Sequence, residues 1–66
     1  MKKFNVINVG DMIVYQSPTN KAYRETGLVI ACSAAGSLTI CWNSGLTTSI
    51  AMSAIARDDY HQHYPA

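Results

Sequence analysis

The chain has 66 residues, of which five are Lys or Arg and four are Asp or Glu, so its formal net charge is +1. This length limits the protein to one domain with a small core, because so short a chain buries only about 60% of its unfolded surface. The near-neutral charge argues against nucleic-acid binding through bulk electrostatics, and a hydrophobic content of 48% argues against a disordered chain.

The N-terminal segment, residues 1–8, is expected to form an arm or an edge strand, because Phe4 and Val6 alternate with a polar residue. Lys2 and Lys3 precede it, but the segment is too polar and too short for the core of a signal peptide. No apolar run in the sequence approaches the ~20 residues that a membrane span requires. We therefore expect a cytoplasmic protein.

From residue 9 onward, short segments rich in β-branched and aromatic residues alternate with turn residues, which predicts strands. The expected strands are Asp11–Gln16, Gly27–Ser33, Leu38–Asn43, Leu46–Ala51 and a short one near Arg57–Tyr60. One helical turn over Met52–Ala56 is expected before the last strand, with Ile55 pointing inward as a plug. The fold class is therefore all-β, a small five-stranded antiparallel barrel over residues 9–60 with a C-terminal tail at residues 61–66.

The pairing of the second and third strands depends on the loop around Gly36. A three-residue loop centred on Gly36 places the apolar sides of both strands on one face, whereas a two-residue turn separates them, because a one-residue slip flips every side chain. We therefore expect the three-residue loop, which uses Gly where a positive φ is needed. The two apolar sets are Leu28, Ile30 and Cys32, and Leu38, Ile40 and Trp42.

The same register decides what we expect of the two cysteines. Cys32 then points into the core and Cys41 points away from it, so the two thiols cannot form a disulfide. A two-residue turn at Gly36-Ser37 would place them opposite each other. We expect two free thiols, buried or half-buried, as in a reducing compartment.

Glycines mark the limits of several expected strands. Gly10-Asp11 opens the first, Gly27 begins the second, and the aliphatic-x-Trp segment Ile40-Cys41-Trp42 runs into a turn at Gly45. In this pattern, over about residues 9–60, the chain resembles small SH3-like barrels of the KOW and Tudor kind. The resemblance implies five short antiparallel strands with ligands bound by loops at one rim. It implies no particular function, since this barrel hosts many unrelated activities.

One enzyme family with this architecture is the plasmid-encoded type II dihydrofolate reductase, a tetramer whose pore is lined by a Val-Gln-Ile-Tyr stretch. The matching stretch here, Thr47-Thr48-Ser49-Ile50, has neither Gln nor Tyr, so no catalytic role carries over. His61 and His63 lie on one side of an extended chain, but a tight metal site needs three or four organised ligands. We expect no enzymatic activity, no catalytic residues, no cofactor and no metal.

The longest connection, Ser17–Thr26, is the best candidate for partner binding, because binding residues concentrate on loops held by a rigid scaffold. Tyr and Arg are favoured interface anchors, although Tyr23 has the alternative of folding back onto the core. Trp42 is either the largest core residue, which we prefer, or a stacking surface. The candidate partner-binding residues are Tyr15, Lys21, Tyr23, Arg24, Trp42 and Tyr60.

No charged residue occurs from Thr26 to Ala56, so no charge protects the strand edges of this segment. Its surface is either covered by a partner or a second copy, or is neutral and hydrated. We expect a non-catalytic interaction module that binds a protein partner or self-associates, such as a small accessory or inhibitory protein of a phage or plasmid. The alternative is a KOW- or Tudor-like nucleic-acid-binding domain in which Tyr15 or Tyr23 stacks on bases.

Overall fold

The computed structural model describes residues 6–66 and has one five-stranded sheet with a short helix before the last strand. The elements are β1 (Met12–Gln16), β2 (Arg24–Cys32), β3 (Ser37–Trp42), β4 (Thr47–Ala51), α1 (Met52–Arg57) and β5 (His61–Tyr64). All neighbouring strands are antiparallel. This confirms the predicted mostly β fold. Within the described residues, no helix is long and apolar enough to cross a membrane.

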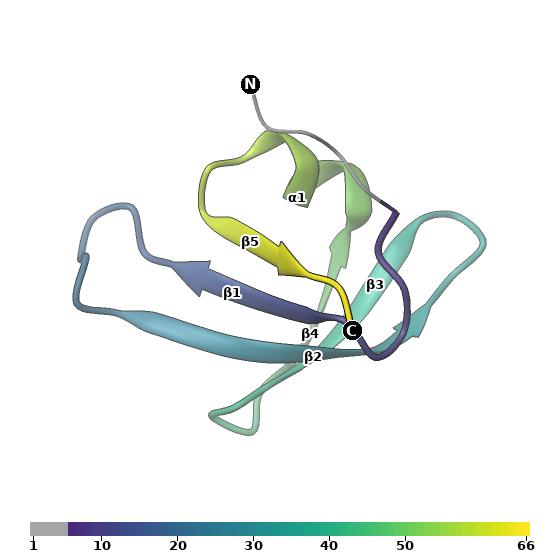
Figure 1. The fold of residues 1–66 in the computed structure, drawn as a ribbon, viewed down its shortest axis with the longest axis horizontal. Coiled ribbons are helices and arrows are strands. Elements are labelled where there is room, and N and C mark those ends of the chain that lie inside the picture. The colour runs from purple at the N-terminus through teal and green to yellow at the C-terminus, as the bar shows by residue number, and fades with distance from the viewer. Residues whose placement is uncertain (1–5) are drawn as a thin grey trace.

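The sheet is curved, but its hydrogen bonding does not close it into the expected barrel. The strand order is β4-β3-β2-β1-β5, so β4 and β5 are the two edges. Figure 1 shows the long β2 curving beneath β1, while α1 lies beside β5 on the other side of β1. Ile55 of α1 is buried in the core, as the sequence predicts.

The core lies on one face of the sheet, because alternate residues of each strand point to the same side. Its buried members are Ile7, Ile13, Val29, Leu38, Ile40, Trp42 and Ile55. Of the described residues in the N-terminal segment, Ile7 is buried in the core, whereas Val6 is exposed. The expectation for Phe4 lies outside the described residues.

The inward side of β2 is the opposite of the predicted one. Val29 is buried, whereas Leu28 and Ile30 are about half exposed. The inward position that precedes Val29 is Gly27, which pairs with Trp42 across the sheet. A side chain at Gly27 would occupy the space of the indole ring, because an added Cβ would lie 2.7 Å from Trp42 Cε3.

The β2–β3 connection explains this inversion. The Ser33 N–H donates to the Ser37 carbonyl at 2.8 Å, so the three-residue loop comprises residues 34–36. The prediction of its length is confirmed, but the loop is not centred on Gly36, which instead ends it with a φ of 87°. The register then shifts at Ile30, where one extra residue forms a β-bulge and reverses the faces of the preceding residues.

Both cysteines are free and exposed. The prediction that Cys32 points into the core is wrong, because Cys32 is exposed. It pairs with Leu38 on the other side of the β-bulge from Val29, so the reversal of faces does not extend to it. The prediction that Cys41 points away from the core is confirmed by its exposure.

The last strand begins later than predicted, because α1 continues through Arg57. Asp58 Oδ1 then accepts the backbone N–H of Tyr60 at 3.0 Å and of His61 at 3.1 Å, which makes a turn before the strand. His61–Tyr64, which the sequence analysis places in a tail, forms β5 and pairs with β1.

Candidate functional site

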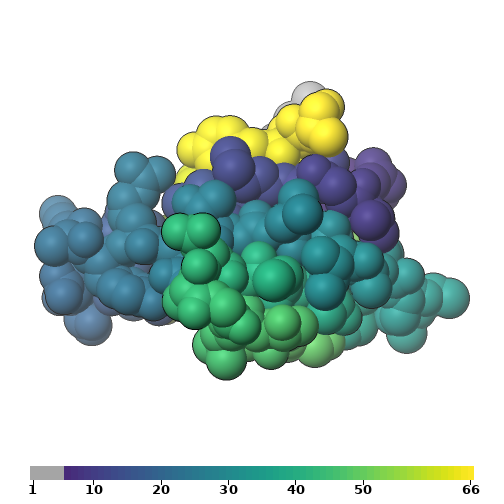
Figure 2. Space-filling view, turned by 90° about the horizontal axis from the view of Figure 1, so that it is seen from below, coloured from purple at the N-terminus to yellow at the C-terminus, as the bar shows by residue number. Residues whose placement is uncertain are grey.

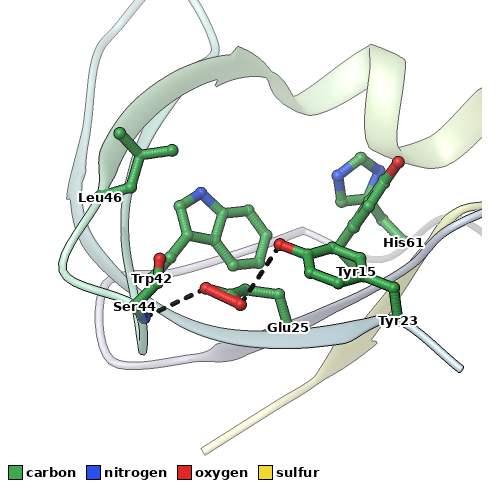
Figure 3. Close-up of a pocket in the computed structure, with 7 residues that line it drawn as sticks. All are labelled: Tyr15, Tyr23, Glu25, Trp42, Ser44, Leu46 and His61. Carbon is green, nitrogen blue, oxygen red and sulfur yellow. Dashed lines mark hydrogen bonds between the residues drawn. The ribbon is translucent and has the colours of Figure 1, made fainter.

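A pocket of about 270 Å³ lies between the starts of the two edge strands. Leu46, which directly precedes β4, and His61, which begins β5, both line it. Its walls are formed by Tyr15, Tyr23, Glu25, Trp42, Ser44, Leu46 and His61 (Figure 3). The pocket therefore opens where the sheet is not closed, and it gathers residues that are far apart in the sequence.

Aromatic rings form most of the pocket wall. The ring centroids of Tyr15 and Tyr23 are 6.1 Å apart and their planes meet at 69°, while Tyr15 and His61 are 5.3 Å apart at 52°. Trp42 and His61 are 6.3 Å apart at 40°. Rings at these separations attract one another, and the Tyr15–Tyr23 pair does so edge to face, so the pocket wall is held in place by its own members.

Trp42 serves the core and the pocket together. It is only 9% exposed and belongs to the core cluster, and its indole Nε1–H donates to Thr48 Oγ1 at 2.7 Å. The predicted core role is confirmed. The indole ring also forms one wall of the pocket (Figure 3). Its use as a stacking surface for a ligand stays a prediction.

Glu25 supplies a negative charge to the pocket (Figure 3). Its Oε1 accepts the Ser44 backbone N–H at 3.1 Å, and its Oε2 accepts the Tyr23 hydroxyl at 3.4 Å. The charge of Glu25, followed by partial burial and the hydrogen bond from the hydroxyl, raises the pKa of Tyr23. Among the described residues, no Lys or Arg pairs with this carboxylate, so its charge is not neutralised by a neighbour.

His61 is held in the pocket wall by Asp58. Its ring is buried, and Nδ1 lies 2.8 Å from Asp58 Oδ2. Burial raises the pKa of Asp58, but hydrogen bonds from the His61 side chain and from the backbone N–H groups of Tyr60 and His61 outweigh it, so the pKa is lowered overall. A charged Asp58 therefore fixes the orientation of the imidazole ring.

The structure divides the predicted partner-binding residues between two surfaces. Tyr15, Tyr23 and Trp42 meet in the aromatic pocket. Lys21 and Tyr60 line a separate, more open hollow. Arg24 is exposed at the start of β2 and lines neither of them.

Glu25 and His61 are not among the predicted partner-binding residues. The predicted strand that follows Glu25 starts too late, at Gly27, and the predicted last strand starts too early, at Arg57. β2 begins at Arg24 and not at Gly27, so the connection after β1 covers residues 17–23 and forms a lobe at one end of the molecule (Figure 2). Counting back in steps of two from Val29 through Gly27 reaches Glu25, and this alternation was the signal that would have placed Glu25 on the inner face of β2.

The two histidines of β5 do not share a site. His61 contacts Asp58, whereas His63 Nε2 lies 2.8 Å from Asp11 Oδ2. Within residues 6–66, no group of three or more His, Cys, Asp or Glu side chains is placed to hold a metal ion.

No protein-family model, no curated protein and no solved structure matches this chain. The chemistry of the pocket is therefore the basis on which a function can be proposed. Its volume is below the 300–1,000 Å³ typical of sites for drug-sized ligands, which suits a single side chain. The faces of aromatic rings attract cations, and the Glu25 carboxylate favours the same sign of charge.

Proposed function

We propose that the protein is a non-catalytic interaction module, a small SH3-like barrel with an open seam, that takes a cationic side chain of a protein partner into its aromatic pocket. The observation that carries this proposal is the Glu25 carboxylate, which has no basic partner among the described residues, surrounded by Tyr15, Tyr23 and Trp42. A cation over such rings gains roughly 0.5–1 kcal/mol at an exposed site and about 2 kcal/mol when desolvated.

An arginine side chain is the best match for this pocket. Its guanidinium group is weakly hydrated, stacks on aromatic faces and hydrogen-bonds carboxylates, whereas the lysine ammonium is compact and strongly hydrated. Glu25 already accepts one hydrogen bond on each oxygen, so the second lone pair of each oxygen is available to a ligand.

Nucleic acid is less favoured as the ligand of this pocket. The aromatic rings would stack on bases, as in proteins that bind single strands. The Glu25 carboxylate among these rings would repel the phosphate backbone, which supplies most of the affinity in nucleic-acid binding. The charge of the pocket therefore supports a protein partner.

The test is an NMR titration of the protein with the tripeptide acetyl-Gly-Arg-Gly-amide, which follows the indole Nε1–H resonance of Trp42. We expect this resonance to shift on binding, and we expect Glu25→Gln to weaken the affinity about tenfold, or about 1.4 kcal/mol. Asp59→Asn is the matched control, because Asp59 lines the other hollow, and it is expected to leave the affinity unchanged.

Equal affinity of the native protein and the Glu25→Gln variant would contradict the proposal, as would the absence of any shift of the indole resonance. A mixed oligonucleotide that binds at 50 mM salt and is released by 200 mM salt would point to the nucleic-acid alternative.

A further inference from the structure

β4 is an open sheet edge that begins beside the pocket. It pairs with β3 on one side, and no other described strand pairs with it. Thr47–Ala51 has no charge and no proline, and its register with β3 has no irregularity. Charges, prolines and bulges are the usual features that prevent sheet edges from pairing with other chains, so this edge is a template for a further strand.

The hydrogen bonds of the β3–β4 hairpin determine which backbone groups face the open edge. The Trp42 N–H donates to the Leu46 carbonyl at 2.7 Å. Hydrogen-bonded and non-hydrogen-bonded pairs alternate along an antiparallel ladder, so Thr48 also directs its N–H and C=O toward β3. Thr47 and Ser49 therefore direct theirs outward, where a partner strand can reach them.

The other edge strand, β5, is protected at both of its ends. The Gln16 N–H donates to the Tyr60 carbonyl at 2.7 Å, so the backbone of His61 faces away from β1 by the same alternation. Asp58 Oδ1 accepts this outward N–H of His61 at 3.1 Å, and Pro65 directly follows the strand. Of the two edges of the described sheet, β4 is therefore the more open to a partner.

We propose that the partner binds as an extended strand along β4 and thereby places its arginine in the aromatic pocket. This inference rests on the proposed function of the pocket. Leu46 is 61% exposed and lines the pocket immediately before β4, so the edge and the pocket are continuous. Main-chain hydrogen bonds to the edge would give affinity, and the pocket would give specificity.

The position of the arginine follows from the pleat of the sheet. The Thr48 hydroxyl accepts the Trp42 indole N–H, so Thr48 points to the pocket side of β4. Residues directly opposite each other on neighbouring strands share a face. The arginine is therefore the partner residue that lies opposite Thr48 or Leu46, with its neighbours on either side pointing away from the pocket.

The distribution of charge over residues 6–66 favours a different protein over a second copy of this chain. The pocket requires a cation, and the basic residues in the described part of the chain are Lys21, Arg24 and Arg57. Lys21 lies in a loop, Arg24 in the central strand β2 and Arg57 at the end of α1. None of the three lies on an edge strand that would pair with β4.

The first test uses the intact protein and the heptapeptide acetyl-Thr-Val-Thr-Arg-Thr-Val-Thr-amide. We expect binding to slow amide hydrogen exchange at Thr47 or Ser49 at least about tenfold, with no comparable change at Thr48, whose N–H is already bonded to β3. Two peptides that are N-methylated on opposite sets of alternate residues form a matched pair. One loses affinity and the other keeps it, because one edge of a strand faces β4.

The second test places proline on the outward edge. Ser49→Pro removes an outward N–H without removing a β3–β4 hydrogen bond, and we expect it to weaken the heptapeptide at least about tenfold while leaving the tripeptide affinity unchanged. Ser49→Ala keeps the N–H and is expected to retain the affinity. If Ser49→Pro does not fold, the two methylated peptides decide the question on the native protein.

The outcomes separate this inference from the proposed function. Binding of the arginine tripeptide without protection of the β4 edge by the heptapeptide would overturn the strand addition alone. If neither peptide binds, both proposals are overturned. A dimer that appears in a light-scattering dilution series with the β4 amides protected would show that a second copy occupies the edge, which also overturns the inference.

Discussion

His63 Nε2 lies 2.8 Å from Asp11 Oδ2, and this contact ties the last strand to the residue that precedes the first. The same carboxylate accepts the backbone N–H of Asn8 at 2.9 Å and that of Ala66 at 3.1 Å. Asp11 is 4% exposed. One buried carboxylate therefore joins β1, β5 and both ends of the described chain.

We predict that Asp11→Asn loosens β5 more than the rest of the sheet. The amide group cannot accept hydrogen bonds at both of its terminal atoms, and it carries no charge to attract His63. The expected result is faster amide exchange in β5 by several fold relative to β3, measured by NMR. Asp59→Asn, on an exposed loop carboxylate, is the control. Equal acceleration in both strands would contradict the anchoring role.

We also predict that the hydrogen bonds of Asp11 cause the protein to lose stability in acid. The backbone N–H of Asn8, the side chain of His63 and the backbone N–H of Ala66 lower the pKa of Asp11 from 3.8 to about 2. The unfolded chain therefore binds a proton before the folded chain does, and the stabilisation present above about pH 4 is lost as the pH falls to about 2. The lowered pKa of Asp58 acts in the same direction.

The single Trp, Trp42, allows this loss to be followed by fluorescence during urea unfolding at each pH. Asp11→Asn is expected to flatten the dependence between pH 4 and pH 2, because the titrating group has been removed. A stability that stays constant over this interval in the native protein would contradict the role of Asp11.

The sequence predicts most of the fold because the apolar alternation and the turn glycines agree with each other in β1, β3 and β4. In β2 that agreement is lacking. Leu28, Val29 and Ile30 are all apolar, so the run gives no period, and the bulge at Ile30 decides the face. A bulge depends on the pairing of two strands and leaves no mark in either one alone.

Part of the candidate site was predictable because apolar alternation and turn residues locate β1 and β3 in the sequence. Tyr15 and Trp42 lie on strands that the sequence places correctly. His61 was missed because the carboxylate of Asp58 makes the turn that delays β5. Nothing in the sequence distinguishes an Asp that accepts such backbone hydrogen bonds from one that does not. Glu25 was missed because an acidic residue on the inner face of a strand opposes the usual pattern of burial.

Thr48→Val is predicted to destabilise the protein through Trp42. Valine has nearly the shape of threonine but no acceptor, so the mostly buried indole Nε1–H would lose its 2.7 Å hydrogen bond. An unpaired buried donor costs about 1–3 kcal/mol, which urea unfolding would measure as a lower midpoint. Thr48→Ser keeps the hydroxyl and is the control. A Val variant as stable as the native protein would contradict this prediction and would show that water replaces the Thr48 hydroxyl as the acceptor of the indole N–H.

Gly27→Ala is predicted to damage the core and the pocket together. An alanine Cβ would lie 2.5 Å from Ile40 Cγ2 and 2.7 Å from Trp42 Cε3, and both distances are too short for real contacts. Replacing Gly by Ala elsewhere often stabilises by about 0.4–1 kcal/mol through the entropy of the unfolded chain, but overpacking of a core costs about 1–3 kcal/mol. We therefore expect net destabilisation in urea.

The indole ring is expected to move to relieve this contact, and since the ring is also a wall of the pocket, affinity for the arginine tripeptide should fall in the same variant. Thr26→Ala, at the exposed neighbouring position of β2, is the control for general effects on the strand. A Gly27→Ala protein that is more stable than the native one and binds the tripeptide equally would contradict this prediction. It would show that the position of the indole ring does not require the absence of a side chain at residue 27.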